Sequence, residues 1–410
     1  MNQTNAHTPT ILCLASFFKG NDFIRECRRQ GARVVLLTRE KLRNEDWARE
    51  SLDDLIAVPD AGDVDSYLRA VMDAARHRRV ARIVALEEYD VITAARIREQ
   101  LCLPGLGSTV ARCFQDKLAM RTRARETSVT QPDFVPALNA EEVAEFLARV
   151  RPPWLLKPRL GASSMGMQKL TDAGQVWQAL AALDARKAWP ERAPAHLLER
   201  FVPGDIFHVD SLVADGRILF ANVEQYGTPP FEVAHAGGVS TSHTVRRGSP
   251  EERKLLAFNR RLLAAFGFER GTTHAEFIRA PTGEFYFLEV AARVGGAYTA
   301  ETIAAATGVN LWREWARLEL STTEQPYVPP RVRADYAGIA VSLARQEAPD
   351  TSSYDEPEIV LRVHKPWHVG LIVRSHSHAR VVSLLDNYAR RFVADFTAIA
   401  PAEERPDQYL

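Results

Sequence analysis

The stretch that decides the fold is His274-Ala-Glu276-Phe-Ile-Arg-Ala-Pro-Thr-Gly-Glu-Phe-Tyr-Phe-Leu-Glu289-Val-Ala-Ala-Arg293. Two runs of apolar, aromatic and β-branched residues, 272–279 and 285–290, flank Pro-Thr-Gly, which favours a tight turn. The pattern predicts two antiparallel strands joined as a hairpin. If Thr282-Gly283 forms the loop, Glu276 lies directly opposite Glu289, with Cβ atoms about 5 Å apart.

Directly opposed carboxylates repel each other unless something neutralises them. A divalent cation would do so, and hard oxygen ligands suit Mg²⁺. Arg293 falls on the same face two pleats later, so the hairpin predicts a magnesium platform with a cation beside it, as phosphoryl transfer requires. An exposed hairpin whose carboxylates meet water is the other interpretation that these residues leave open.

Length and net charge limit the classes of protein to which this chain can belong. A chain of 410 residues is expected to hold two or three lobes around a sizeable core. Lys and Arg total 52, as do Asp and Glu, so the net charge is zero, which argues against nucleic acid as a general partner. No apolar run approaches the ~20 residues that cross a bilayer. We therefore expect a cytoplasmic protein without a membrane partner.

The four cysteines are Cys13, Cys27, Cys102 and Cys113. Their spacing fits neither a zinc site nor a disulfide framework, and it predicts buried free thiols in a reducing compartment.

Residues 1–110 alternate short apolar runs, at 11–16, 33–38, 55–58 and 82–86, with helical spacing, which predicts an open parallel α/β lobe. The turn Ser16-Phe-Phe-Lys-Gly20 lacks G-x-G-x-x-G, so a dinucleotide site is not expected there. Glu88 follows the last of these runs, at the strand end where open α/β sheets bind ligands, although a solvated carboxylate is the commoner outcome.

A second signal lies at residues 154–167, where Lys157 stands near the end of an apolar strand and a loop of glycine and serine follows. Glycine lets backbone N–H groups converge on phosphate oxygens, and serine hydroxyls and a lysine add donors. The candidate phosphate-binding residues of the loop are Gly161, Ser163, Ser164 and Gly166. The loop is not a P-loop, and an ordinary Gly-Ser hairpin loop is the plain alternative.

Upstream, Lys117 stands in the first turn of a helix expected to continue through Arg125. Downstream, a strand breaks at Pro203-Gly204, and the exposed backbone at 199–202 is suited to pairing with an adenine edge. Asp205 is suited to a ribose hydroxyl. A hairpin with its turn at Asp215-Gly216 is predicted next.

The order of these parts resembles the ATP-grasp superfamily, and within it the carboxylate–amine ligases, including the L-amino-acid ligases. The resemblance covers about residues 80–320. It implies an ATP-grasp fold of mixed α/β and α+β class, with an N-terminal open parallel lobe (1–110) before the ATP-grasp region (111–325). That region would divide into a lid subdomain, about 125–198, and a metal-binding core, about 199–325, with a C-terminal α+β piece at 326–410.

By the same resemblance, Lys117 and Lys157 contact ATP phosphates while the loop from Gly161 to Gly166 closes over them. Glu276 and Glu289 hold Mg²⁺, and Arg293 steadies the acyl phosphate as the catalytic residue. Gly295-Gly296 brings the backbone close to the acyl group. The residues implied around the nucleotide are Glu199, Arg200, Phe201, Val202, Asp205, His208 and Phe287.

Two positions depart from the family pattern. The metal motif is often E-x-N-x-R, whereas this chain has Ala291 in place of the amide. Many members place a glutamate two residues after the turn glycine, and here that residue is Ile206, so Asp205 is the nearest substitute.

The resemblance implies an ATP-dependent ligase that joins a carboxylic acid to an amine through an acyl phosphate and releases ADP and phosphate. Its substrates would be small molecules, with amino acids favoured. A carboxylase-type member that uses bicarbonate and an ATP-binding regulatory protein without turnover stay open, with a nicotinamide oxidoreductase as a weaker option. A homodimer is also left open.

Overall fold

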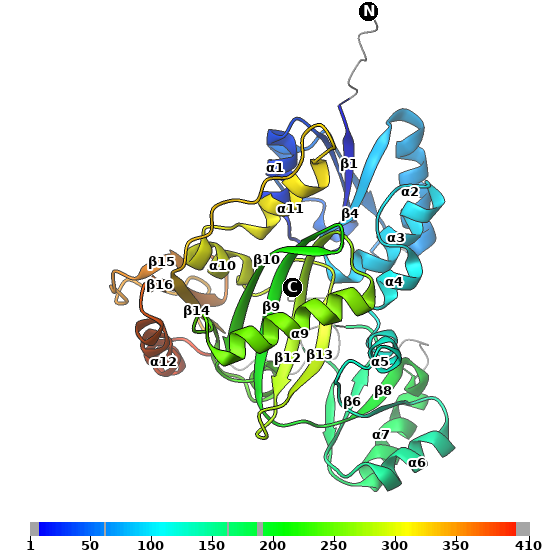
Figure 1. The fold of residues 1–410 in the computed structure, drawn as a ribbon, viewed down its shortest axis with the longest axis vertical. Coiled ribbons are helices and arrows are strands. Elements are labelled where there is room, and N and C mark those ends of the chain that lie inside the picture. Colours follow the sequence, from blue (N-terminus) through cyan, green and yellow to red (C-terminus); the bar gives the residue numbers. More distant parts are fainter. Residues whose placement is uncertain (1–7, 61–62, 162–163, 187–191, 399–410) are drawn as a thin grey trace, which may run out of the picture.

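The computed structural model describes residues 8–60, 63–161, 164–186 and 192–398, which form three sheets (Figure 1). The first sheet is parallel and the other two are antiparallel, so the predicted mixture of α/β and α+β structure is confirmed. Within these residues, no helix has both the length and the apolar character needed to span a membrane.

The first lobe is an open parallel sheet of four strands in the order β3-β2-β1-β4. All six residues of its inner strand β1 are buried, as expected for a parallel strand covered on both faces. Glu87 and Glu88 follow the end of β4 after one residue, Leu86. The elements are β1 Thr10–Ala15, α1 Asn21–Arg29, β2 Arg33–Arg39, β3 Asp54–Val58, α2 Val64–His77, β4 Val80–Ala85, α3 Val91–Gln100 and α4 Ser108–Arg112.

A small antiparallel sheet in the order β5-β8-β6-β7 forms the region expected to be the lid. Helix α5 (Lys117–Glu126) leads into it and begins at an Asp116 cap, whose side chain accepts from Leu118 N at 3.0 Å. Trp154 and Leu156 of the sheet pack with α6 and α7 in a core of their own. The elements are β5 Phe134–Pro136, α6 Ala140–Arg149, β6 Trp154–Pro158, β7 Gln168–Leu170, α7 Ala173–Asp184 and β8 His196–Arg200.

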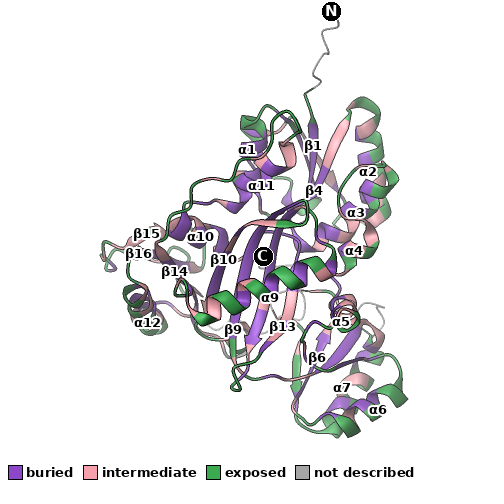
Figure 2. Cartoon of the chain, viewed as in Figure 1, coloured by how far each residue is buried: buried purple, intermediate pink, exposed green. Residues whose placement is uncertain are grey.

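The central sheet has eight strands in the order β13-β12-β9-β10-β11-β14-β16-β15. Helix α9 crosses one face of it in Figure 1, and Figure 2 shows exposed residues on the outer side of that helix over buried strands. Its strands and helices up to residue 320 are β9 Asp205–Ala214, β10 Arg217–Tyr226, α8 Pro230–Ala236, β11 Ser240–Thr244, α9 Pro250–Phe266, β12 Gly271–Arg279, β13 Phe285–Ala291, α10 Thr299–Thr307 and α11 Leu311–Leu320.

The C-terminal strands continue this central sheet, because β11 pairs with β14. The elements in the part of the chain expected to be α+β are β14 Tyr336–Leu343, β15 Ile359–Arg362, β16 His368–Ser375 and α12 His378–Asp395. Tyr354, Tyr388 and Phe392 form the aromatic centre between this part of the sheet and α12.

The β12–β13 hairpin has the predicted pairing at its carboxylates but a different turn. Glu276 lies opposite Glu289. The loop is nevertheless the three residues Pro281-Thr282-Gly283, because Ala280 N donates to Glu284 O at 2.9 Å. A β-bulge at Leu288 restores the register, since Phe277 pairs with Phe287 while the next pair is Glu276–Glu289.

The bulge also corrects the prediction for Phe287. Without it, Phe287 and Glu289 would share a face, since they are two residues apart. Instead the Phe287 ring lies 5.5 Å from Phe266 of α9 and is completely buried, on the face away from the carboxylates. The structure therefore gives Phe287 a core-packing position.

The cysteine prediction holds in part. All four thiols are free, but Cys13 and Cys27 alone are buried, while Cys113 is half-buried and Cys102 is exposed. Position in the sequence did not reveal that Cys102 lies in a turn, where its φ is 52°.

The assignment of Phe287 to the core can be tested against its direct pairing partner, Phe277. Phe287→Leu and Phe277→Leu are each expected to lower the free energy of unfolding by about 1 kcal/mol, because each loses ring volume in the same packed layer. Urea unfolding measures this loss, and calorimetry with Mg²⁺-ADP should give equal affinities for both variants. Weaker nucleotide binding in Phe287→Leu alone would return Phe287 to the nucleotide site.

Candidate active site

Glu276 and Glu289 project from the same face of neighbouring strands and are neutralised by different groups. Glu276 Oε1 accepts from the Tyr226 hydroxyl at 3.0 Å and lies 3.4 Å from His274 Nε2. Glu289 Oε2 lies 3.3 Å from Lys117 Nζ. Burial opposes ionisation of Glu276, but the His274 imidazolium outweighs it, and the pKa of Glu276 is lowered.

This donor set fits Mg²⁺. Two carboxylates on one face supply hard oxygen ligands, which the smaller cation accepts together with waters and phosphate oxygens. Ala291 lies opposite His274 and offers a methyl group. One position that an amide would fill therefore falls to water or to a second carboxylate oxygen.

Lys117 contacts both the β12–β13 hairpin and the loop after β6. Its Nζ donates to Gly161 O at 2.5 Å, besides pairing with Glu289. Burial works against a charged lysine, but Glu289 and Glu88 outweigh it, so the pKa of Lys117 is raised. The Lys117 ammonium thus lies between Glu289 and Gly161 at the start of the loop.

Lys157 forms a buried cluster with Glu199 and Arg121. Lys157 Nζ lies 2.5 Å from Glu199 Oε2, and Arg121 Nε lies 2.7 Å from Glu199 Oε1. Burial lowers the pKa of Lys157, and Arg121 competes with it for the same carboxylate. For Glu199 the two cations outweigh burial and lower the pKa.

The cluster carries surplus positive charge. One carboxylate faces two cations, and Arg121 Nη1 is buried without a hydrogen-bond partner among the described residues. A buried unpaired N–H is costly unless a ligand satisfies it. An oxyanion is the ligand that its charge favours.

The described residues of the loop after β6 have several positive φ angles. Gly161 has φ +133° and Gly166 has φ +67°, both in the region that favours glycine, and a Cβ at Gly161 would meet nothing within 4 Å. Ser164 also has a positive φ, 59°, and its carbonyl accepts from Met167 N at 3.4 Å. Ser163 lies outside the described residues.

The backbone at 199–202 is less open than expected. Arg200 N donates to Asp133 O at 2.8 Å, and Phe201 N donates to Pro153 O at 3.0 Å, so both groups are used within the lid. Val202 is buried in an apolar cluster with Ile206, against which the bulge residue Leu288 packs.

Two further residues expected near the nucleotide have other partners. Asp205 forms an ion pair of 2.5 Å with Arg279 and lines a cavity of about 400 Å³ beside the hairpin turn. His208 is fully buried, and its Nδ1 lies 2.6 Å from Asp210 Oδ2.

Arg293 connects the central sheet to the first lobe. Its Nη2 donates to Glu88 Oε2 at 2.8 Å, and its Nε lies 3.8 Å from Glu87 Oε1. Lys19 Nζ is 2.5 Å from the other oxygen of Glu87. Burial raises the pKa of Glu88, and the two glutamates raise that of Arg293 against the effect of burial.

Sequence reasoning pointed to Glu88 but missed several residues of the site. Arg121 was detectable, because it lies one helical turn after Lys117 and so shares its face of α5. Lys19 and Glu87 follow β1 and β4, whose parallel pairing brings their carboxyl ends together. No sequence signal identified Tyr226 or Asp210, which come from neighbouring strands.

Two family models match the chain and together cover more than half of it. Residues 150–301 match the ATP-grasp domain, and residues 24–105 match the ATP-grasp N-terminal domain. This chain belongs to the ATP-grasp superfamily.

Two curated relatives are named as ligases. The L-arginine-specific L-amino acid ligase of Bacillus subtilis is 23% identical over 283 residues, which cover 68% of this chain and 66% of the relative. The alanine–anticapsin ligase of Bacillus subtilis (strain 168) is 24% identical over 235 residues, 52% of this chain and 48% of the relative. The match thus spans just under two thirds of the first relative's length and about half of the second's.

Solved structures share the whole fold. The L-amino acid ligase from Bacillus licheniformis gives a TM-score of 0.73 at 16% identity, covering 96% of this chain and 99% of that one. The N5-carboxyaminoimidazole ribonucleotide synthetase from Thermus thermophilus gives 0.69 at 18% identity, covering 96% and 100%. The predicted ATP-grasp fold is confirmed.

The Lys157 cluster allows a test of the phosphate site. Lys157→Met leaves Glu199 paired with Arg121, so the fold should persist while one phosphate contact is lost. A charge-assisted contact contributes roughly 1.5–3 kcal/mol, so ADP affinity should fall about one to two decades. Calorimetry measures this, with Lys254→Met on the exposed face of α9 as the control. Equal affinity in the two variants would remove Lys157 from the phosphate site.

Proposed function

We propose that this protein is an ATP-dependent carboxylate–amine ligase that forms an amide or peptide bond through an acyl phosphate and releases ADP and phosphate. The observation that carries the proposal is the opposed pair of Glu276 and Glu289, with Lys117 bound to one of them and to the lid loop. This arrangement gathers metal-binding oxygens and a phosphate-binding ammonium at one place.

The ATP phosphates would lie between the lid loop and the hairpin. Lys117 would leave Glu289 for a phosphate oxygen when a cation takes its place, so the charge at Glu289 stays balanced. Lys157 and Arg121 would use their surplus charge on the phosphates. Glu276 and Glu289 would hold Mg²⁺, which would supply positive charge to offset the charge of the phosphates during phosphoryl transfer.

The adenine would lie on the apolar cluster of Val202, Ile206 and Ile278, beside Leu288. Val202 follows β8, while Ile206 and Ile278 are paired residues of β9 and β12 on the face of the central sheet that carries Glu276. Leu288 occupies this position because the bulge turns it and Glu289 to the same side.

The acid and the amine would bind where the first lobe meets the hairpin. Arg293 presents a planar fork that suits the oxygens of an acyl phosphate. Glu87 and Glu88 lie beside it as two buried carboxylates, which suit a substrate that carries an ammonium group. An amino acid carries both charges, and this supports amino acids as substrates.

A carboxylase-type reaction is the second candidate, because the same platform could phosphorylate bicarbonate. Its support is the shared fold with the N5-carboxyaminoimidazole ribonucleotide synthetase. A regulatory protein without turnover is the third, and it is suggested by the methyl group of Ala291 in place of a metal ligand.

A phosphate-release screen separates these functions. With Mg²⁺-ATP and amino acids tested singly and in pairs, we expect ADP and phosphate to form only when both an acid and an amine are present. Hydroxylamine in place of the amine should capture the acyl phosphate as a hydroxamate. Glu289→Gln is the control, and it should nearly abolish release because it removes charge that offsets the metal.

Each other outcome points elsewhere. AMP and pyrophosphate would indicate an adenylate and contradict the proposal. ADP formation that requires bicarbonate would favour the carboxylase. Tight ATP binding without release under any pairing would favour the regulatory protein.

A further inference from the structure

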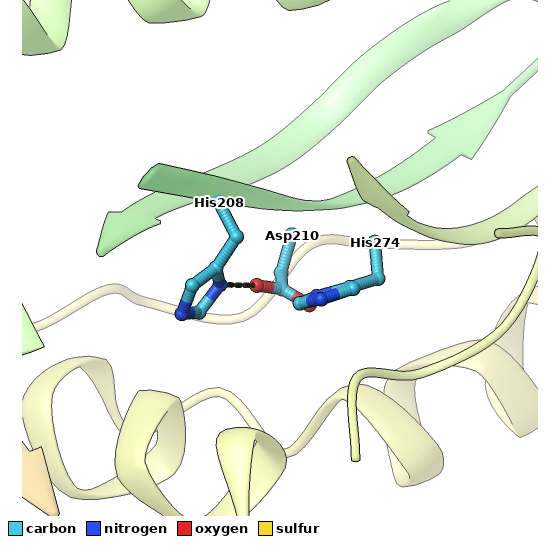
Figure 3. Close-up of side chains that lie close together, drawn as sticks. All are labelled: His208, Asp210 and His274. Atoms are coloured by element: carbon cyan, nitrogen blue, oxygen red, sulfur yellow. Dashed lines mark hydrogen bonds and ion pairs between the residues drawn. The ribbon is translucent and has the colours of Figure 1, made fainter. Parts of the chain in front are cut away.

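Three buried side chains form a chain of hydrogen bonds on the site face of the central sheet (Figure 3). His208 and Asp210 come from β9, and His274 comes from β12. Asp210 accepts at both oxygens, from His208 Nδ1 at 2.6 Å and from His274 Nδ1 at 2.9 Å. His208 and Asp210 have no exposed surface, and His274 is 8% exposed. The buried carboxylate is therefore held between two imidazoles.

These contacts are hydrogen bonds and do not fit a metal site. Ligand atoms about 2.0–2.1 Å from a tetrahedral Zn²⁺ lie roughly 3.3 Å apart, which is longer than either contact of Asp210. The outer nitrogen of His208 is also engaged, at 3.0 Å from Ser242 Oγ. The three residues form a rigid structural unit.

His274, at one end of this unit, contacts Glu276 of the proposed metal platform, the Glu276–Glu289 pair. His274 Nε2 lies 3.4 Å from Glu276 Oε1, the oxygen that also accepts from Tyr226. A histidine ring held through Nδ1 has its Nε2 fixed in direction. Asp210 thus sets the orientation of the group that orients Glu276.

The same unit lies against the loop that carries Arg293. A Cβ at Gly295 would lie 2.8 Å from Asp210 Oδ1, 2.9 Å from His274 Nδ1 and 2.9 Å from Thr299 Cβ. Such distances are too short for carbon contacts, so the backbone at 295 can reach this position only as glycine. Gly295 therefore packs directly on the Asp210–His274 pair, two residues beyond Arg293.

We propose that Asp210 is a positioning residue that fixes two parts of the reaction centre, Glu276 and the loop of Arg293, relative to each other. Through His274 it orients Glu276, and through its contact with Gly295 it sets the backbone that carries Arg293. The inference rests on the proposed function, because it takes Glu276 as a ligand of Mg²⁺.

The first test replaces Asp210 by Asn, which keeps the shape and removes the charge. Calorimetric binding of ADP over a series of Mg²⁺ concentrations gives the half-saturating Mg²⁺. We expect Asp210→Asn to raise it at least tenfold, while ADP affinity at saturating Mg²⁺ stays near that of the wild type. A purely structural role would weaken ADP binding at all Mg²⁺ concentrations alike.

The matched control is Ser211→Ala, on the same strand but on the opposite face. Ser211 is fully buried and accepts from Asn259 Nδ2 at 2.9 Å, so this variant also loses a buried hydrogen bond. It should lower thermal stability without changing the half-saturating Mg²⁺. An equal Mg²⁺ effect in both variants would contradict a specific role for Asp210.

A second variant tests the packing contact independently. Gly295→Ala must displace Asp210 or His274, whereas a Cβ at Gly296 would meet only Lys19 Nζ, at 3.9 Å. Gly295→Ala should therefore raise the half-saturating Mg²⁺ for ADP binding, and Gly296→Ala should not. If Asp210→Asn does not fold, this pair decides the question.

Glu276→Gln separates this inference from the proposed function. If it leaves the Mg²⁺ dependence of ADP binding unchanged, the metal platform itself is wrong. If Glu276→Gln raises the half-saturating Mg²⁺ but neither Asp210→Asn nor Gly295→Ala does, the platform stands and the positioning role of Asp210 is overturned.

Discussion

The repulsion between Glu276 and Glu289 is the constraint on which the rest of the site depends. Two directly opposed carboxylates on one face of a hairpin repel each other unless cations or donors lie beside them. Glu276 is paired with His274 of its own strand β12 and with Tyr226 of β10, and Glu289 is paired with Lys117 of α5. The hairpin thus fixes which groups must surround it.

These neutralising groups come from different parts of the fold, so they also connect its sheets. Lys117 reaches from Glu289 to Gly161 at the start of the lid loop. Arg293 reaches from the end of the hairpin to Glu88 of the first lobe. A ligand that replaces Lys117 at Glu289 would therefore also change the contact between Lys117 and Gly161.

The sequence predicted local features well, because alternation and turn residues depend on near neighbours. The pairing of Glu276 with Glu289 was predicted correctly from an incorrect two-residue loop, since the three-residue loop and the bulge at Leu288 compensate. A bulge adds one residue and leaves no clear pattern, so the sequence did not reveal that Phe287, expected around the nucleotide, packs in the core. The contacts of Asp210 and Arg121 depend on strand order and helix placement, which distant segments determine.

The most direct test of the metal platform is a crystal structure of the protein with Mg²⁺ and ADP. Our expectation is a cation bound by oxygens of both Glu276 and Glu289, with Lys117 moved from Glu289 to a phosphate oxygen. A cation bound without either glutamate, with Lys117 still paired to Glu289, would contradict it.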